Sequence, residues 1–188
     1  MNNQDKYFMS IALELAKKGF PSPNPYVGAV IVKNNKIIGK GFHKRAGLPH
    51  AEIEAINSVK NKSLIKGSIL YVTLEPCSHY GKTPPCTAAI IKYSISKVIF
   101  GVKDPTTKVK GEEVLRKNKI ITASSLLSKE SENLNEVFFH YTKKHLPFIA
   151  LKVASSSDGF ISKKCQKTNI TGKAAKLFSH KLRSKYDA

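Results

Sequence analysis

Two stretches of sequence organise this chain: His50-Ala51-Glu52, and Pro76-Cys77-Ser78-His79-Tyr80-Gly81-Lys82-Thr83-Pro84-Pro85-Cys86. His50, Cys77 and Cys86 are the ligand types of a catalytic zinc site, which uses three protein ligands and keeps a fourth position for water. Glu52 is suited to handle protons beside that water, whose pKa the metal lowers towards about 7. The pattern predicts one zinc ion per chain, with Glu52 as general acid and base.

A closed structural zinc site is the competing interpretation of this cluster. Such sites usually have four protein ligands, and the remaining cysteine, Cys165, lies in a different segment of the sequence. An open site with three protein ligands therefore fits the sequence better.

The order of these residues resembles that of the zinc nucleobase deaminases, in which a His-x-Glu motif precedes a Pro-Cys motif and the Glu is not a ligand. The two cysteines of that superfamily are usually separated by two residues, whereas eight residues lie between Cys77 and Cys86. With this longer insert the chain resembles the deaminase domain of the RibD/RibG family of riboflavin biosynthesis. The resemblance implies a three-layer α/β/α cytidine deaminase-like fold with a mixed central sheet.

Further site residues follow from the same resemblance. Pro23-Asn24-Pro25, Gly41-Phe42-His43 and Lys103-Asp104-Pro105 match segments of that family. By this carry-over, Asn24, His43, Lys82 and Asp104 bind the substrate. Each also has a plainer interpretation, since Asn and Asp beside proline are ordinary turn residues, His43 follows a predicted strand, and Lys82 is one lysine among many.

Hydrophobic periodicity and turn residues predict alternating helices and strands. The expected helices cover residues 5–18, 50–59, 83–93, 111–117 and 128–143, and the expected strands cover residues 27–32, 37–42, 68–74, 97–102 and 120–123. The first two strands form a hairpin about residues 33–36. In the last helix, Leu134, Val137, Phe138 and Tyr141 form the expected apolar face.

Two domains are expected. Residues 1–146 form the zinc-dependent deaminase domain, and residues 147–188 resemble the start of a dihydrofolate reductase-like domain. The alternative for residues 147–188 is a docking segment without chemistry. Because only the start of that second domain is present, we expect this chain not to use NADPH.

The net charge of +19 raises the question of a nucleic-acid partner. Only three of the 32 basic residues are Arg, the residue preferred for base and phosphate recognition, so no nucleic-acid partner is expected. There is no apolar run long enough for a membrane span and no signal-peptide pattern at the N-terminus. With few cysteines, these features are typical of a cytoplasmic protein.

The resemblance implies deamination of 2,5-diamino-6-(5-phosphoribosylamino)pyrimidin-4(3H)-one to 5-amino-6-(5-phosphoribosylamino)uracil, with release of ammonia. A tRNA adenosine or cytidylate deaminase is one alternative, which the charge favours and the eight-residue spacing opposes. A non-catalytic, zinc-stabilised binding module is another, which Glu52 beside an open metal position opposes. A phosphoribosylated pyrimidine is the expected ligand, and a homo-oligomer and a separate reductase polypeptide are open alternatives as partners.

Overall fold

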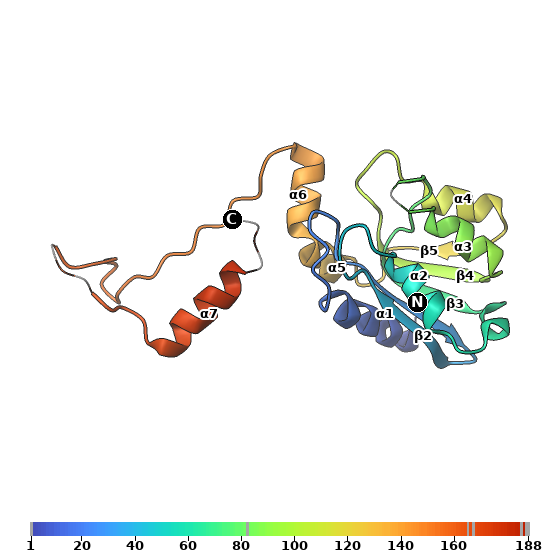
Figure 1. Ribbon diagram of the computed structural model, residues 1–188, viewed down its shortest axis with the longest axis horizontal. Coiled ribbons are helices and arrows are strands. Elements are labelled where there is room, and N and C mark those ends of the chain that lie inside the picture. The colour runs from blue at the N-terminus through green and yellow to red at the C-terminus, as the bar shows by residue number, and fades with distance from the viewer. Residues whose placement is uncertain (1, 82, 165, 167, 185, 187–188) are drawn as a thin grey trace. The chain divides into compact units, whose positions relative to one another are not determined.

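The computed structural model describes residues 2–81, 83–164, 166, 168–184 and 186. The chain divides into two compact units, Met1–Phe148 and Ile149–Ala188. The first unit contains a five-stranded sheet in the order β2-β1-β3-β4-β5 (Figure 1). The second unit contains one helix, α7 (Lys173–Arg183), among its described residues.

The sheet is mixed. Strands β1 (Gly28–Lys33) and β2 (Lys36–Phe42) form an antiparallel hairpin. Its turn residues Asn34 and Asn35 have φ of 49° and 58°, the left-handed conformation that suits a two-residue hairpin turn. Strand β3 (Ile69–Leu74) is antiparallel to β1, whereas β3, β4 (Lys97–Val102) and β5 (Ile121–Ala123) run parallel to one another.

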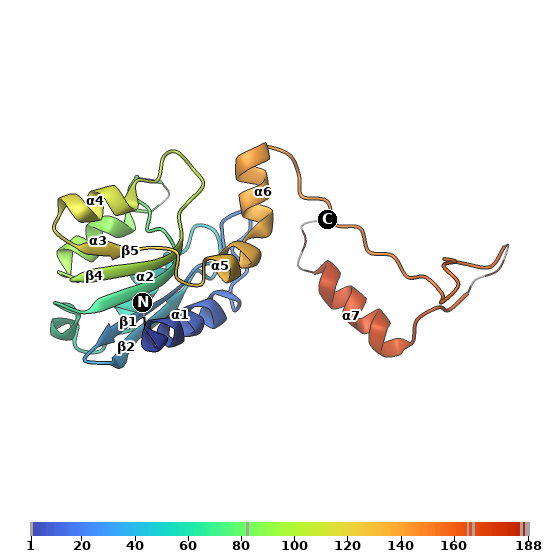
Figure 2. The same cartoon turned by 180° about the vertical axis from the view of Figure 1, so that it is seen from behind.

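Helices cover both faces of the sheet because alternate strand residues point to opposite sides. Helix α1 (Asn3–Ala16) packs Phe8, Met9 and Ala12 against one face, where Val30, Tyr71 and Ile99 are buried. Helices α2 (Ala51–Ser58), α3 (Cys86–Lys92) and α4 (Gly111–Lys117) pack on the other face (Figure 2). The predicted three-layer α/β/α fold with a mixed sheet is confirmed.

Two predicted helices begin later than expected. The helix predicted for residues 83–93 begins at Cys86, with Pro85 in an extended conformation at its N-cap. A residue that precedes proline is pushed away from helical geometry, so the Pro84-Pro85 pair delays the start. The helix predicted to open at His50 begins at Ala51, and His50 is its N-cap residue with ψ of 164°. A short 3₁₀ turn, η1 (Lys62–Ile65), precedes β3.

The single helix predicted for residues 128–143 is wrong. The structure has two helices there, α5 (Ser128–Leu134) and α6 (Glu136–Lys144), and Asn135 separates them. The predicted apolar face is also wrong in part, because Val137 and Tyr141 are exposed while Phe139 is buried. Asn135, at the break, makes hydrogen bonds with the backbone of Tyr26 instead of continuing the helix.

In the second unit, a turn at Ser156 is closed by hydrogen bonds with Asp158 and Phe160. Helix α7 exposes Leu177 and Phe178. The proposed reductase-like character of residues 147–188 stays a prediction. Among the described residues, no helix combines the length and apolar character that crossing a membrane requires.

Candidate metal centre and substrate pocket

Three elements bring the predicted zinc ligands together. His50 caps α2, Cys77 follows β3, and Cys86 is the first residue of α3. The Nδ1 atom of His50 lies 3.5 Å from the Cys77 sulfur and 3.3 Å from the Cys86 sulfur, and the three ligand atoms lie within 4.8 Å of one another. Zn–N and Zn–S bonds of usual length at a tetrahedral angle place N and S about 3.6 Å apart. The three side chains therefore fit a tetrahedral zinc ion with one further position.

The two thiols are already polarised for metal binding. The Cys86 backbone N–H donates to the Cys77 sulfur at 3.3 Å. Hydrogen bonds from Cys86 and then from His50 lower the pKa of Cys77 to about 4, against the opposing effect of burial. The pKa of Cys86 is raised because its proton is shared with Cys77 and because it is buried. The two sulfurs are hydrogen-bonded to each other, and a bound zinc ion would displace the proton that they share.

The imidazole of His50 has a neighbouring group at its second ring nitrogen, Nε2, as well. Its Nε2 atom lies 3.5 Å from the hydroxyl oxygen of Thr83, while Nδ1 faces the two sulfurs. A partner on the second ring nitrogen fixes which nitrogen faces a metal. Sequence analysis missed Thr83 because it was placed inside a helix; the structure puts it in the loop that precedes α3.

Glu52 is buried in the first turn of α2, with 4% of its surface exposed. Burial, followed by the negative charge of Cys77, raises the pKa of Glu52 to about 7, and a hydrogen bond with the Cys86 thiol partly opposes this rise. A carboxyl group with such a pKa gains and loses a proton near neutral pH. Glu52 therefore has the burial and the proton affinity of a general acid and base beside the His50 cluster.

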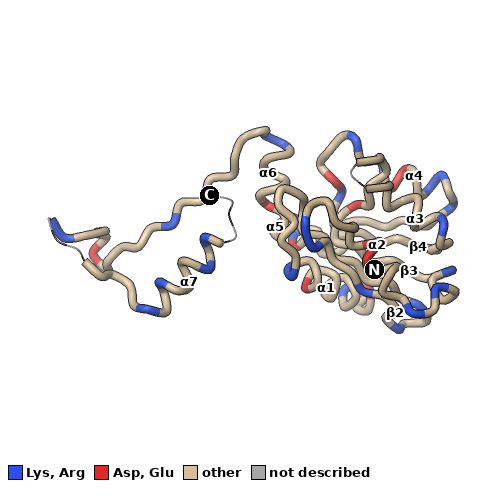
Figure 3. The backbone as a smooth tube through the Cα atoms, viewed as in Figure 1, with Lys and Arg blue, Asp and Glu red and all other residues tan. Residues whose placement is uncertain are grey.

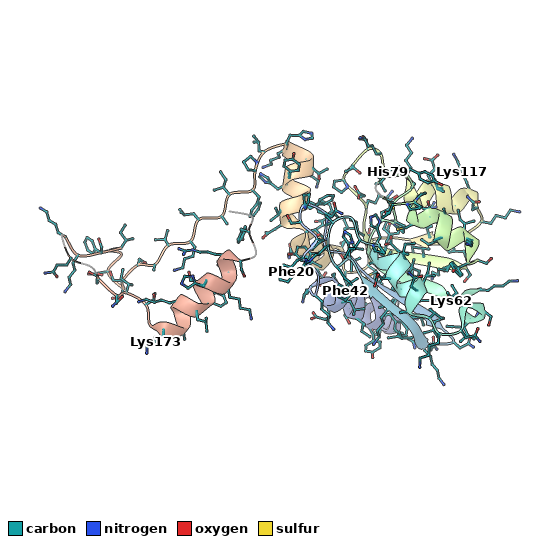
Figure 4. The ribbon with its side chains drawn as sticks, in the orientation of Figure 1. Phe20, Phe42, Lys62, His79, Lys117 and Lys173 are labelled. Carbon is teal, nitrogen blue, oxygen red and sulfur yellow. The ribbon has the colours of Figure 1, made fainter. Side chains whose placement is uncertain are left out.

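A cavity of about 350 Å³ opens on this cluster, and its lining includes Glu52, His50 and Cys77. Asn24, His43 and Asp104, which the resemblance assigns to the substrate, line the same cavity. The fourth such residue, Lys82, lies outside the residues that the structure describes. His79, to which the sequence gives no role, is exposed and is also among the residues that line this cavity; Figure 4 labels it.

Asn24 and His43 form one hydrogen-bonded pair. His43 is buried, and its Nδ1–H donates to the Pro49 carbonyl at 3.1 Å. Burial lowers the pKa of His43, so the ring is neutral and Nε2 accepts from the Asn24 amide at 3.0 Å. This arrangement uses the nitrogen of the Asn24 side chain and leaves its oxygen as an acceptor.

Asp104 is held by residues that sequence analysis did not select. One oxygen of its carboxylate, Oδ1, accepts from the Thr106 backbone N–H at 2.8 Å and from the Thr106 hydroxyl at 2.6 Å. The backbone N–H groups of Asp104 and Glu112 donate to the Glu75 carboxylate at 3.3 Å and 2.9 Å. Glu75 immediately precedes Pro76-Cys77, and that position was the available signal. Glu75 and Thr106 also line the cavity.

Comparison with known proteins places the chain among deaminases. The sequence-family model named for the cytidine and deoxycytidylate deaminase zinc-binding region matches residues 2–102. A diaminohydroxyphosphoribosylamino-pyrimidine deaminase of Buchnera aphidicola subsp. Schizaphis graminum (strain Sg) is 49% identical over 148 residues, which cover 77% of this chain and 99% of that protein.

Longer relatives match as well. The riboflavin biosynthesis protein RibD of Buchnera aphidicola subsp. Baizongia pistaciae (strain Bp) is 45% identical over 190 residues, which cover 98% of this chain and 50% of that protein. The solved structure of Acinetobacter baumannii RibD, form 2, has a TM-score of 0.92 and 40% identity, covering 98% of this chain and 52% of that one. The chain thus spans about half the length of the RibD relatives that it matches.

Proposed function

This chain belongs to the family of cytidine and deoxycytidylate deaminases defined by that zinc-binding region, and we propose that it catalyses the deamination step of riboflavin biosynthesis. The substrate is 2,5-diamino-6-(5-phosphoribosylamino)pyrimidin-4(3H)-one, and the products are 5-amino-6-(5-phosphoribosylamino)uracil and ammonia. The relatives named as RibD and as a diaminohydroxyphosphoribosylamino-pyrimidine deaminase support this choice within the family.

One observation carries the proposal: a cluster of three zinc-type ligands and a buried carboxyl group adjoins a single cavity, which His50, Cys77 and Glu52 line. His50, Cys77 and Cys86 fit a zinc ion with one further position, and Glu52 lies beside them. A structural zinc site has its positions filled by protein ligands, whereas a catalytic site keeps one for water. The open position and the adjacent proton carrier favour hydrolysis over a purely structural role.

We assign the proton transfers to Glu52. A bound zinc ion supplies a water molecule of lowered pKa. The Glu52 carboxylate takes a proton from the attacking water and delivers it to the ring nitrogen next to the carbon that bears the 2-amino group, while the water oxygen bonds to that carbon. Glu52 then carries the second proton to the amino nitrogen. The C–N bond breaks, the electron pair stays on nitrogen, and ammonia leaves.

Recognition of the pyrimidine is assigned to the carry-over residues. Because the amide nitrogen of Asn24 is bound to His43, the Asn24 oxygen is the group that accepts a hydrogen bond from the substrate's N–H groups. The second carboxylate oxygen of Asp104, Oδ2, accepts a hydroxyl or N–H in the same way, since Thr106 occupies Oδ1. We assign the phosphate to Lys82, as the family resemblance implies.

The partners and the cofactors follow from this reaction. We propose one zinc ion per chain, no use of NADPH by this chain, and a reductase activity that acts on the deaminated product. Substrate-linked oxidation of NADPH by the purified protein would refute the second of these proposals.

The test of the function is ammonia release by the zinc-loaded protein. The phosphoribosylated diaminopyrimidine is offered beside cytidine, dCMP and a tRNA, each at several concentrations. We expect kcat/KM to be highest for the diaminopyrimidine. Preferential turnover of dCMP or tRNA would move the protein to the alternative deaminase class, and release of no ammonia from any of them would favour a binding module.

A further inference from the structure

Asn135 makes an unusual pair of contacts with a residue 109 positions earlier in the chain. Its side-chain oxygen accepts from the Tyr26 backbone N–H at 2.7 Å, and its side-chain nitrogen donates to the Tyr26 carbonyl at 2.9 Å. Asn135 is 2% exposed. A buried amide that satisfies both backbone groups of one residue acts like a strand partner and fixes that residue closely.

The local contact of the Asn135 side chain is a long one, because its nitrogen also donates to the Ser131 carbonyl one turn earlier at 3.4 Å. Asn135 has φ of −116° and ψ of 26°, and these angles interrupt what would otherwise be one helix through α5 and α6. Asn is a weaker helix former than most of its alternatives, and the interruption loses helical hydrogen bonds. The contact with Tyr26 offsets this loss, so the residue serves a tertiary purpose.

Both partners of this contact belong to walls of the cavity. Tyr26 lies between Pro25 and Val27, and these two residues and Asn24 line the cavity. Phe138, which lies in the first turn of α6 after Asn135, lines the cavity as well. One buried side chain therefore joins the wall that carries Asn24 to the helix that carries Phe138.

Other hydrogen bonds hold the wall that carries Asn24, residues 24–27, from a different direction. The Asn24 N–H donates to the Pro21 carbonyl, and the His43 N–H donates to the Val27 carbonyl. These bonds tie residues 24–27 to their own turn and to the end of β2. Asn135 adds a link between Tyr26 and the start of α6, where it is the N-cap residue.

We propose that Asn135 is a positioning residue for the substrate, which sets Asn24 and Phe138 at the separation that holds the pyrimidine over the metal ligands. This inference rests on the proposed function. A polar acceptor and an aromatic side chain are complementary to a heterocyclic ring. Misplacing a reactant by about 1 Å reduces turnover by up to about 10²-fold, so a loosened wall has a measurable effect.

The test compares Asn135→Asp with Asn118→Asp in the zinc-loaded protein. Asp has the size of Asn, but its carboxylate does not donate to the Tyr26 carbonyl. Asn118 is exposed at the end of α4, where its amide donates to the Val114 carbonyl. We expect Asn135→Asp to keep its zinc and to raise KM for the diaminopyrimidine about tenfold or more, and Asn118→Asp to behave as the wild type.

A purely structural role predicts a different pattern. It lowers the melting temperature and the active fraction of Asn135→Asp but leaves KM unchanged, and that result would overturn the inference. Asn135→Ser, which loses both Tyr26 contacts without adding charge, provides the same comparison if the Asp variant folds poorly. A rise of KM in either variant, with zinc content retained, supports the positioning role.

A binding measurement separates this inference from the proposed function. Calorimetry with 5-amino-6-(5-phosphoribosylamino)uracil gives a dissociation constant that requires no turnover. If the wild type binds this ligand but releases no ammonia, the proposed reaction fails, while weaker binding by Asn135→Asp still supports the positioning role. Equal binding by the wild type and the Asn135 variants refutes the positioning role, whatever the activity.

Discussion

At the scale of single residues, the burial of Glu52 determines what it is able to do. A carboxylate in water has a pKa near 4.3 and holds no proton at neutral pH. Burial raises the pKa of Glu52 to about 7, and the positive charge of a bound metal opposes that rise. Burial thus brings the proton affinity of Glu52 into the range in which a carboxyl group both takes and gives protons near neutral pH.

Glu52→Gln tests this role because Gln has nearly the same shape and no titratable proton. We expect kcat to fall about 10²–10⁴-fold, the usual contribution of general acid and base catalysis. Zinc content and substrate KM should stay close to the wild-type values. Elemental analysis and ammonia release measure the two effects on the same sample. Turnover near the wild-type rate would remove Glu52 from the mechanism.

The ligand cysteines make a separate prediction. Loss of a residue that hydrogen-bonds a metal ligand weakens metal affinity about 10–100-fold, so loss of a ligand itself in Cys77→Ser or Cys86→Ser should weaken zinc binding at least that much. Folding should suffer too, since metal binding and folding are coupled. Cys165→Ser is the matched control, because the sequence leaves Cys165 outside the ligand set. Stoichiometric zinc in both ligand variants, measured after dialysis, would contradict the assignment.

Sequence analysis reached some of these residues and not others for a physical reason. The Cys and His side chains of a zinc site belong to few chemical classes, so His50, Cys77 and Cys86 are recognisable from their type and spacing. The residues that it missed form hydrogen bonds with partners that are distant in the chain or lie in irregular loops; they are Glu75, Thr106 and Asn135. Such partners emerge only when the chain is folded.

At the scale of elements, the segments flanked by turn residues were the easiest to predict. The boundaries of β4 and α4 match the predicted ones, since turn residues flank both segments. The helices near the site departed from prediction where a tertiary or steric effect intervened. Pro84 and Pro85 delay α3, and the Tyr26 contact divides α5 from α6. The departures thus cluster around the candidate site, as expected where function competes with local preference.

The loop from β4 to α4 is held in part by one carboxylate, beside the Ser78 hydroxyl that accepts the Lys110 backbone N–H at 2.8 Å. Its residue Asp104 and the α4 residue Glu112 both donate a backbone N–H to Glu75. The N-cap residue of α4, Lys110, offers no side-chain cap. Gly111 fits closely under this segment, because an added Cβ would lie 2.0 Å from the Pro76 carbonyl oxygen. Glu75 therefore serves α4 as a cap supplied by the neighbouring strand.

Glu75→Gln removes an acceptor from one of these two N–H groups. A buried donor left unsatisfied costs about 1–3 kcal/mol, so the free energy of unfolding should fall by about that amount in urea titrations. Glu113→Gln, on the same helix, is the control: it removes an exposed ion pair with Lys117, and because such pairs contribute little to stability, its effect on the urea midpoint should be clearly smaller. Equal shifts in the two variants would show that Glu75 does not cap α4.

At the scale of the whole molecule, the basic charge is spread rather than gathered at the site. Lys and Arg occur along both units (Figure 3), including exposed positions such as Lys117 on α4 (Figure 4). Among the described residues that line the cavity, those with a carboxyl group are Glu52, Glu75 and Asp104. A phosphate on the substrate therefore needs a cation from elsewhere in the chain, and we propose Lys82 for that role.

Every described residue assigned to the deaminase site lies in the first unit, Met1–Phe148. The Buchnera deaminase that matches over 99% of its own length does so within 148 aligned residues. A protein ending at Phe148 should therefore bind zinc and release ammonia with the kcat/KM of the full chain. The measurement compares the two proteins at equal zinc occupancy.

A second, shorter protein is the control for this comparison. A protein ending at Leu134 retains the zinc ligands and Glu52 but lacks Asn135 and α6, which carries Phe138. If the pocket needs this helix, the shorter protein should lose most of its kcat/KM even where it still binds zinc. Loss of activity in the protein ending at Phe148, with zinc retained, would instead assign residues 149–188 a part in deamination.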